Sequence, residues 1–176
     1  YLLLPQIFRT EAECFFREQA ERVVDLPLDA LIIRNLEEPG FFETLYGERN
    51  RRCPAFYFDF QVYGMNRTAQ RCLREFGAAR LTLPIEETAR ELKSLDTAGQ
   101  EMVVAGRLPM MVSANCLKKT AARCDHKPEY MKLRDRRMME MPVKTHCTFC
   151  YNTIYNAAPL SLSGVAAELT GLKLGA

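Results

Sequence analysis

Short apolar runs alternate with amphipathic stretches from residue 1 to about residue 112, and this alternation constrains the fold more than any other feature. Such a pattern is typical of repeated β-α units on a parallel sheet. Thr10 with Glu13 predicts a capping box, and Gly77 predicts a helix stop. The predicted strands are Leu2–Phe8, Ala30–Arg34, Ala55–Val62, Arg80–Leu83 and Met102–Val112, and the predicted helices are Glu11–Val24, Arg67–Phe76 and Ile85–Leu95.

Beyond Val112 the apolar pattern changes to a two-residue period. It predicts a β-hairpin of Tyr130–Arg134 and Met138–Lys144 around a polar turn. A last strand at Thr153–Tyr155 and a helix over Ser163–Leu169 follow.

Five β-α strands are too few for a closed eight-stranded barrel, which takes about 250 residues. We therefore expect an α/β fold in which residues 1–114 form the C-terminal half of a TIM-type barrel. Residues 115–176 would add a cysteine-rich basic segment with the hairpin. An open doubly wound sheet is the rival fold, although the first turn lacks a glycine-rich phosphate loop.

The chain has 176 residues and opens on a strand-like segment without an initiator Met. We expect a piece of a longer polypeptide that lacks an N-terminal half. Bare strand edges predict that the piece forms a homo-oligomer or that the hairpin protects the edges. Seven cysteines, an odd number, and the charged, helix-rich surroundings of Cys14, Cys53 and Cys72 favour a reducing cytoplasm. The apolar runs are too short to span a bilayer.

Polar residues stand near the carboxyl ends of the predicted strands, where functional groups collect in parallel α/β folds. A buried parallel strand should be apolar throughout, yet Asp59 and Gln61 interrupt one. They are expected to face a polar site, although an exposed edge strand explains them equally well. The candidate catalytic residues are Asp59, Gln61, Asn66 and Arg107.

Four of the seven cysteines, Cys116, Cys124, Cys147 and Cys150, are separated by 7, 22 and 2 residues. Soft thiolates ligate zinc and iron–sulfur clusters alike, and nearby cations favour the thiolate form. The alternative is that these cysteines are scattered small hydrophobic residues. We expect them to hold a metal site at the end of the last barrel strand.

Positive charge is concentrated around these cysteines. Residues 115–144 contain nine Lys or Arg and four Asp or Glu, a balance of +5, against −3 for the rest of the chain. A phosphate backbone would fit this charge, while a solvated charged hairpin is the simpler explanation. The candidate nucleic-acid-binding residues are Lys118, Lys119, Arg123, Lys132, Arg134, Arg136 and Arg137.

Several blocks, taken in order, resemble a known family. They are "VYGMN", "FGAARLTLPIEE", "GRLPMMVSANC", "YMKLRDRR" and "NTIYNAAPLSL". The family is the collagenase-like peptidases of unassigned catalytic type, number thirty-two.

The resemblance implies a β/α barrel whose later strands this chain supplies. It also implies either a peptidase or an oxygen-independent hydroxylation factor for transfer RNA, ribosomal RNA or ubiquinone. Such factors bind a [4Fe–4S] cluster, which the resemblance assigns to Cys116 and then to Cys124, Cys147 and Cys150. The usual spacing is tighter, since here Asp125–Met141 intervenes between the second and third thiols.

Three hypotheses follow. The chain belongs to an iron–sulfur hydroxylation enzyme acting on tRNA or rRNA, to a metal-dependent peptidase, or to a zinc-stabilised RNA-binding or structural module. In the first case an aerobic preparation would hold zinc or an empty site, because exposed clusters are lost to oxidation.

Overall fold

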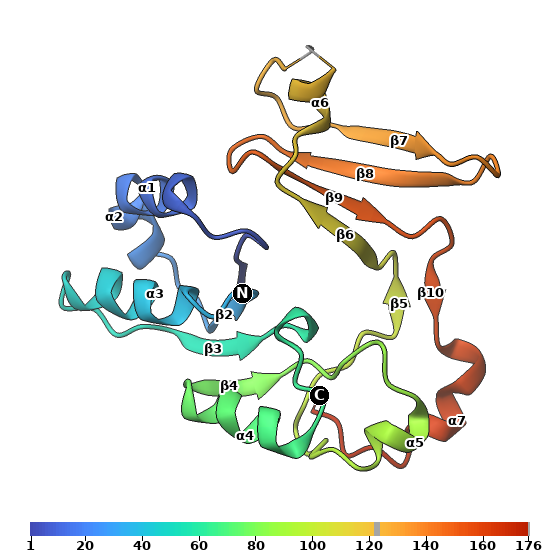
Figure 1. Ribbon diagram of the computed structural model, residues 1–176. Helices are drawn as coiled ribbons and strands as arrows, with labels where there is room; N and C mark the ends of the chain where they lie inside the picture. Colours follow the sequence, from blue (N-terminus) through green and yellow to red (C-terminus); the bar gives the residue numbers. More distant parts are fainter. Residues whose placement is uncertain (122–123, 176) are drawn as a thin grey trace.

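The computed structural model describes residues 1–121 and 124–175. It is a mixed α/β structure with one parallel and one antiparallel four-stranded sheet (Figure 1). The mixed class predicted from the sequence is therefore confirmed. No helix within the described residues is long and apolar enough to cross a membrane.

The parallel sheet has the strand order β1-β2-β3-β4, with each strand pairing only with its chain neighbours in that order. Helices alternate with these strands, as the apolar pattern predicts. The strands are β1 (Leu2–Leu3), β2 (Ala30–Ile33), β3 (Ala55–Phe58) and β4 (Ala78–Leu81), and the helices are α1 (Thr10–Glu18), α2 (Ala20–Val24), α3 (Glu38–Gly47) and α4 (Arg67–Glu75).

The predicted strand Met102–Val112 is wrong as a single parallel strand. This stretch divides into β5 (Ala105–Gly106) and β6 (Pro109–Ser113), and Gly106, at the end of β5, has a φ of 132°. Both strands pair antiparallel, β5 with β10 (Leu160–Ser161) and β6 with β9 (Tyr151–Tyr155). The chain leaves the parallel sheet after the isolated parallel bridge between Thr82 and Glu101.

The antiparallel sheet has the strand order β6-β9-β8-β7. Its hairpin of β7 (Tyr130–Arg134) and β8 (Glu140–His146) confirms the hairpin predicted from the two-residue period. This hairpin pairs with β9 and not with an edge of the parallel sheet. The sheet also contains β6, which precedes residue 115. The sheet therefore includes chain from both sides of the expected domain boundary.

Several local predictions need correction. The capping box of Thr10 and Glu13 is absent, because Arg9 is the N-cap of α1 and makes no side-chain cap. A capping box does form at Thr88 and Glu91, before α5 (Ala89–Leu92). The helix α3 was missed, because Pro39 and Gly40 near its start weaken its helical pattern.

Short helices complete the structure. Cys116 is the N-cap of α6 (Leu117–Thr120). The described residues include the 3₁₀ turns η1 (Phe60–Val62), after β3, and η2 (Ser163–Val165), before α7 (Ala166–Leu169). The predicted glycine stop is confirmed, since Gly77 follows α4 with a φ of 94°.

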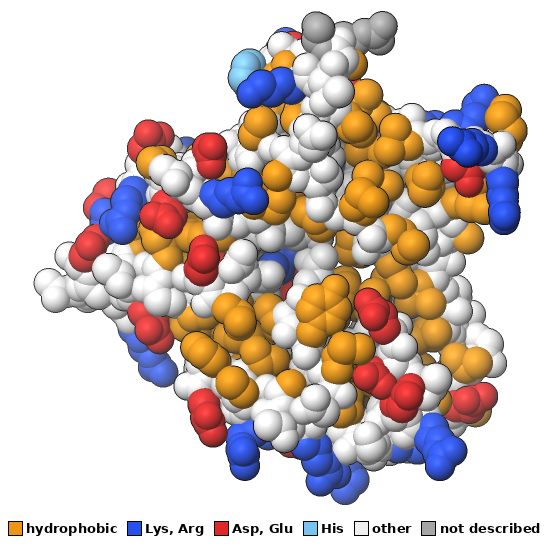
Figure 2. Space-filling view, in the orientation of Figure 1, with side chains coloured by type: hydrophobic (Ala, Val, Ile, Leu, Met, Phe, Trp, Pro, Cys, Tyr) orange, Lys and Arg blue, Asp and Glu red, His pale blue; other side chains and the backbone are white. Residues whose placement is uncertain are grey.

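One face of the parallel sheet packs against the helices. Leu31, Ile33, Phe56 and Phe58 are buried in one apolar cluster with side chains from α1 to α4. The alternate residues form a row across the opposite face, in the paired order Leu3, Ile32, Tyr57 and Arg80. Apolar side chains are visible near this face and over the antiparallel sheet (Figure 2).

Phe149, in the turn between β8 and β9, joins the antiparallel sheet to this core. Its ring centroid lies 5.3 Å from that of Phe15 and 6.1 Å from that of Phe16, both on α1. Aromatic pairs at these separations add to the stabilisation from buried area. The turn that carries Cys147 and Cys150 is therefore fixed against α1.

We expect Phe149→Ala to lower the free energy of unfolding by about 2 to 3 kcal/mol, less than for a fully buried phenylalanine because the ring is half-buried. Urea denaturation followed by circular dichroism measures this change. Phe76→Ala is the control, since Phe76 is 53% exposed. An equal effect of the two substitutions would contradict this role of Phe149.

Candidate functional site at the junction of the sheets

Three polar side chains from two segments, Arg34 after β2 and Asp59 and Gln61 after β3, meet at the carboxyl edge of the parallel sheet. Arg34 directly follows β2, and Asp59 directly follows β3. The Arg34 Nε lies 3.3 Å from Asp59 Oδ2 and donates to Gln61 Oε1 at 3.0 Å. Both charged side chains are nearly buried, with 12% and 13% of their surface exposed. The predicted candidates Asp59 and Gln61 therefore do lie together in a polar site, although they follow β3 and are not within it.

The network continues into the antiparallel sheet through Gln6, which follows β1. Gln6 Nε2 donates to Gln61 Oε1 at 2.9 Å, and Gln6 Oε1 accepts from Thr153 Oγ1 at 2.6 Å. The backbone N–H of Gln6 donates to the Tyr151 hydroxyl at 3.2 Å. We call Gln6, Arg34, Asp59, Gln61 and Thr153 the polar centre.

Glu38 lies beside the polar centre at the start of α3 and is fully buried. Its Oε2 accepts from the backbone N–H groups of Arg34 at 2.7 Å and Asn35 at 3.1 Å. Its Oε1 has no hydrogen-bond partner among the described residues. Burial raises the pKa of Glu38 to about 8, even though the hydrogen bonds from the backbone N–H groups of Arg34 and Asn35 and the charge of Arg34 lower it; the Asp59 carboxylate makes a smaller contribution that raises it. Glu38 is therefore largely protonated at neutral pH.

Burial also shifts the pKa values of two other groups at this junction, Asp59 and His146. It raises the pKa of Asp59, while the Arg34 guanidinium lowers it. Burial lowers the pKa of His146 to about 4, and the positive charges of Lys144 and Arg34 act in the same direction. The neutral His146 ring stacks on Tyr151 at a centroid distance of 4.3 Å, and its Nε2 lies 3.1 Å from Thr153 Oγ1.

The candidates Asn66 and Arg107 have contacts of their own outside the polar centre. The Asn66 side chain caps α4 by accepting from the backbone N–H of Ala69 at 2.8 Å. Arg107 Nη1 donates to the backbone carbonyl of Asn156 at 2.9 Å. Asn66 thus stabilises the start of α4. Arg107, which lies just before β6, links that segment to the chain after β9.

Two of the other candidate thiols, Cys116 and Cys124, act on Cys150. The pKa of Cys150 is raised by burial, and then by the charges of the Cys116 and Cys124 thiolates, while Lys119 lowers it. Cys150 has a left-handed backbone with a φ of 53°. Cys147 has a different partner, since its Sγ donates to the Lys127 carbonyl at 3.1 Å. Across residues 1–121 and 124–175, no three His, Cys, Asp or Glu side chains form a ready-made metal site.

The candidate nucleic-acid-binding cations differ in their surroundings. The Lys118 side chain is 3% exposed, forms an ion pair with Asp125 and donates to the Lys127 carbonyl at 2.9 Å, so its ammonium is already bonded within the protein. Lys132 and Arg134 both bind Glu140, at 2.8 Å and 2.7 Å. Arg123 lies outside the described residues. Lys119, Arg136 and Arg137 are exposed.

Sequence reasoning missed Arg34, Glu38, Gln6, Thr153 and Tyr151. The signal for Arg34 is its position directly after an apolar strand, the same signal that pointed to Asp59. Glu38 gives no such signal, because a Glu–Glu–Pro sequence is typical of a solvated helix start.

Comparisons with family models, curated proteins and solved structures add no relative. None of them matches this chain.

We expect Glu38→Gln to change how stability depends on pH. Between the ordinary pKa of 4.5 and about 8, the folded protein keeps the Glu38 proton and the unfolded chain releases it. The native carboxyl therefore costs stability progressively as pH rises, reaching roughly 3 to 5 kcal/mol near pH 8. Glutamine does not ionise, so the variant should gain stability relative to the native protein as pH rises.

Urea unfolding at several values from pH 5 to pH 8 measures this difference. Glu43→Gln, an exposed glutamate on the same helix, is the matched control and should follow the native curve. A constant difference between Glu38→Gln and the native protein over this range would show that Glu38 is not protonated in the fold.

Proposed function

We propose that this chain is the cluster-bearing part of an iron–sulfur-dependent, oxygen-independent hydroxylation enzyme that acts on transfer or ribosomal RNA. The observation that carries the proposal is that the charges of Cys116 and Cys124 act on Cys150, which puts these three thiols in one part of the molecule, although the described residues do not form a ready-made metal site. Cys150 directly precedes Tyr151, whose hydroxyl accepts from Gln6. One short turn thus connects the thiols to the polar centre.

The donor set fits an iron–sulfur cluster. Cys116, Cys124 and Cys150 supply soft thiolate ligands, and Cys147 is the fourth candidate in the same turn as Cys150. Cys147 would have to give up its hydrogen bond to the Lys127 carbonyl to join them. A bound [4Fe–4S] cluster supplies electron transfer to such a site.

The polar centre offers the groups that bind and orient a polar substrate. Arg34 donates through Nε to Gln61 and through Nη1 to the Leu4 carbonyl, so its guanidinium keeps further N–H donors for an anionic or carbonyl oxygen. Asp59 and Gln61 hold that guanidinium in place. Glu38 holds a proton at a carboxyl group behind Arg34, and such a group can donate a hydrogen bond at neutral pH.

RNA as the substrate class is supported by exposed cations near the thiols and on the hairpin. The charge of Lys119 lowers the pKa of Cys150. Arg136 and Arg137 lie in the turn between β7 and β8. Asp135 binds the backbone N–H groups of Arg137 and Met139 at 2.8 Å each, which fixes the turn that carries both arginines. A fixed, exposed cationic turn suits contact with a phosphate backbone.

The first test is anaerobic reconstitution with iron and sulfide. The native chain should gain a broad visible absorbance together with bound iron and sulfide, and Cys116→Ser, Cys124→Ser, Cys147→Ser and Cys150→Ser should each lose most of both. Cys14→Ser and Cys72→Ser, two exposed cysteines on α1 and α4, are the controls. Zinc without sulfide in the native chain would instead favour the zinc-stabilised module, and equal iron in all variants would exclude this ligand set.

The second test is RNA binding over a salt series, with Arg136→Gln plus Arg137→Gln compared with the native chain. Loss of two backbone contacts should reduce the slope of log K against log salt by about 1.4 on single-stranded RNA. Arg22→Gln plus Arg90→Gln removes the same charge from α2 and α5 and should leave the slope unchanged. Salt-insensitive binding, or an equal effect of both double variants, would exclude RNA as the substrate. A peptidase or a small-molecule hydroxylase would then be the better proposal.

A further inference from the structure

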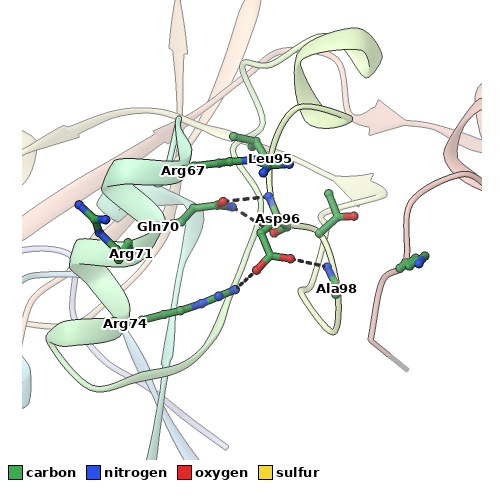
Figure 3. A pocket seen from close by; sticks show the side chains of 9 residues that line it. Arg67, Gln70, Arg71, Arg74, Leu95, Asp96 and Ala98 are labelled. Carbon is green, nitrogen blue, oxygen red and sulfur yellow. Dashed lines mark hydrogen bonds and ion pairs between the residues drawn. The ribbon is translucent and has the colours of Figure 1, made fainter.

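A second site lies away from the thiols, on the outer side of the parallel sheet. It is a cavity of about 510 Å³ between α4, the loop of residues 95–98 and the C-terminal tail (Figure 3). Its charged lining consists of four cations, Arg67, Arg71, Arg74 and Lys173, and one anion, Asp96. The lining therefore carries four positive charges and one negative charge, a balance of +3.

The loop that forms one wall of the cavity is held rigidly. Gln70, which is 2% exposed, donates from Nε2 to the Asp96 carbonyl at 3.3 Å and accepts at Oε1 from the Asp96 N–H at 3.0 Å. Through these two hydrogen bonds, the Gln70 side chain satisfies both backbone groups of Asp96, as a paired residue of a neighbouring strand would, and so fixes the loop to α4. Figure 3 shows Gln70 facing the loop from the middle of α4.

The only carboxylate in the lining is already neutralised. Asp96 forms an ion pair with Arg74 at 2.7 Å and accepts from the backbone N–H of Ala98 at 3.3 Å. The hydrogen bond from Arg74 lowers the pKa of Asp96, so the carboxylate stays charged and occupied. Because Asp96 is paired with Arg74, the lining has no further carboxylate to balance the charges of the other three cations.

Arg67 and Lys173 carry that unbalanced charge. Arg67 donates from Nε to the uncharged carbonyl of Ser94 at 2.7 Å. It is also the first residue of α4, where the helix dipole is positive and a cation is unfavourable. Lys173 comes from a distant segment, which the backbone bonds Gly99 N to Lys173 O at 2.8 Å and Gly175 N to Gln100 O at 2.9 Å place beside the cavity.

Arg71 stands at the rim of the cavity. Figure 3 shows its side chain turned away from Asp96, and its contact with Glu75 on the same helix is long, at 3.9 Å. Arg67, Arg71 and Arg74 follow one another at spacings of four and three residues, so they are neighbours on the helix surface. Like charges at these spacings repel, and an anion bound between them would relieve the repulsion.

We propose that this cavity binds a phosphate group, with Arg67 and Lys173 as the contacting side chains. Guanidinium groups match phosphate oxygens through paired N–H donors, and Lys173 adds a point charge from the opposite wall. The phosphate belongs either to a small phosphorylated molecule or to an RNA backbone, since both present the same oxygens. The site is independent of the thiols and of the hydroxylation proposed above.

The experiment uses the whole chain and two probes. Inorganic phosphate is titrated by isothermal calorimetry with chloride as the background anion, and a single-stranded oligouridylate is titrated in parallel by fluorescence anisotropy. Arg67→Gln plus Lys173→Gln should weaken phosphate binding by about fivefold or more, as expected for the loss of two exposed charge contacts. Arg90→Gln plus Arg22→Gln, with the same loss of charge elsewhere, should leave the affinity unchanged.

Because Arg67 also bonds to Ser94, Lys173→Glu is a second variant that leaves α4 untouched, and thermal melting verifies that each variant folds. If the double variant and Lys173→Glu weaken phosphate alone, the ligand is a small phosphorylated molecule. If both also weaken oligouridylate, and phosphate competes with it, the ligand is an RNA backbone. The proposal is overturned if the native chain binds no phosphate, or if these variants and the control double variant bind it equally well.

Discussion

The position of the candidate site depends on the packing of Phe149 against α1. The β8–β9 turn would otherwise be a free hairpin end of the antiparallel sheet. Because the ring of Phe149 packs on Phe15 and Phe16, the turn is attached to the core of the parallel sheet. This attachment places Cys150 near the start of α1 and places Tyr151 and Thr153 against Gln6. One apolar contact thus fixes two sets of polar groups.

Arg34 organises the polar centre electrostatically. It is a buried cation with one carboxylate partner, Asp59, and its charge reaches Glu38, His146, Tyr151 and Tyr155. Burial of a cation is tolerated only with such partners. Burial shifts Glu38 and His146 toward their neutral forms, so near neutral pH the pair of Arg34 and Asp59 accounts for most of the charge. A neutral acid and a neutral imidazole beside one ion pair form an environment in which a polar ligand would meet little competing charge.

The sequence predicted the β-α alternation, the hairpin and the position of Asp59 and Gln61, because each depends on local periodicity or on a residue that breaks an apolar run. It did not predict the end of the parallel sheet. Met102–Val112 is apolar enough for a buried parallel strand, and only its pairing with β10 and β9 reveals two antiparallel strands. Lys118 shows the same limit, since a lysine in a basic segment is expected in solvent, yet its side chain is buried and paired with Asp125. Glu38 was invisible for the same reason, because its burial results from the tertiary structure and not from its neighbours in the chain.

The bond between Gln6 and Thr153 has a consequence for folding. Its two residues are separated by 147 positions, so the bond cannot form until β9 has been synthesised. Contacts of such long range carry a large loop-closure cost and form late, whereas the β7–β8 hairpin closes over a few residues. During synthesis the strands β1 to β4 emerge first and await β9, with the carboxyl edge of their sheet incomplete. The polar centre is therefore assembled late in folding, once β9 has joined the edge of the parallel sheet.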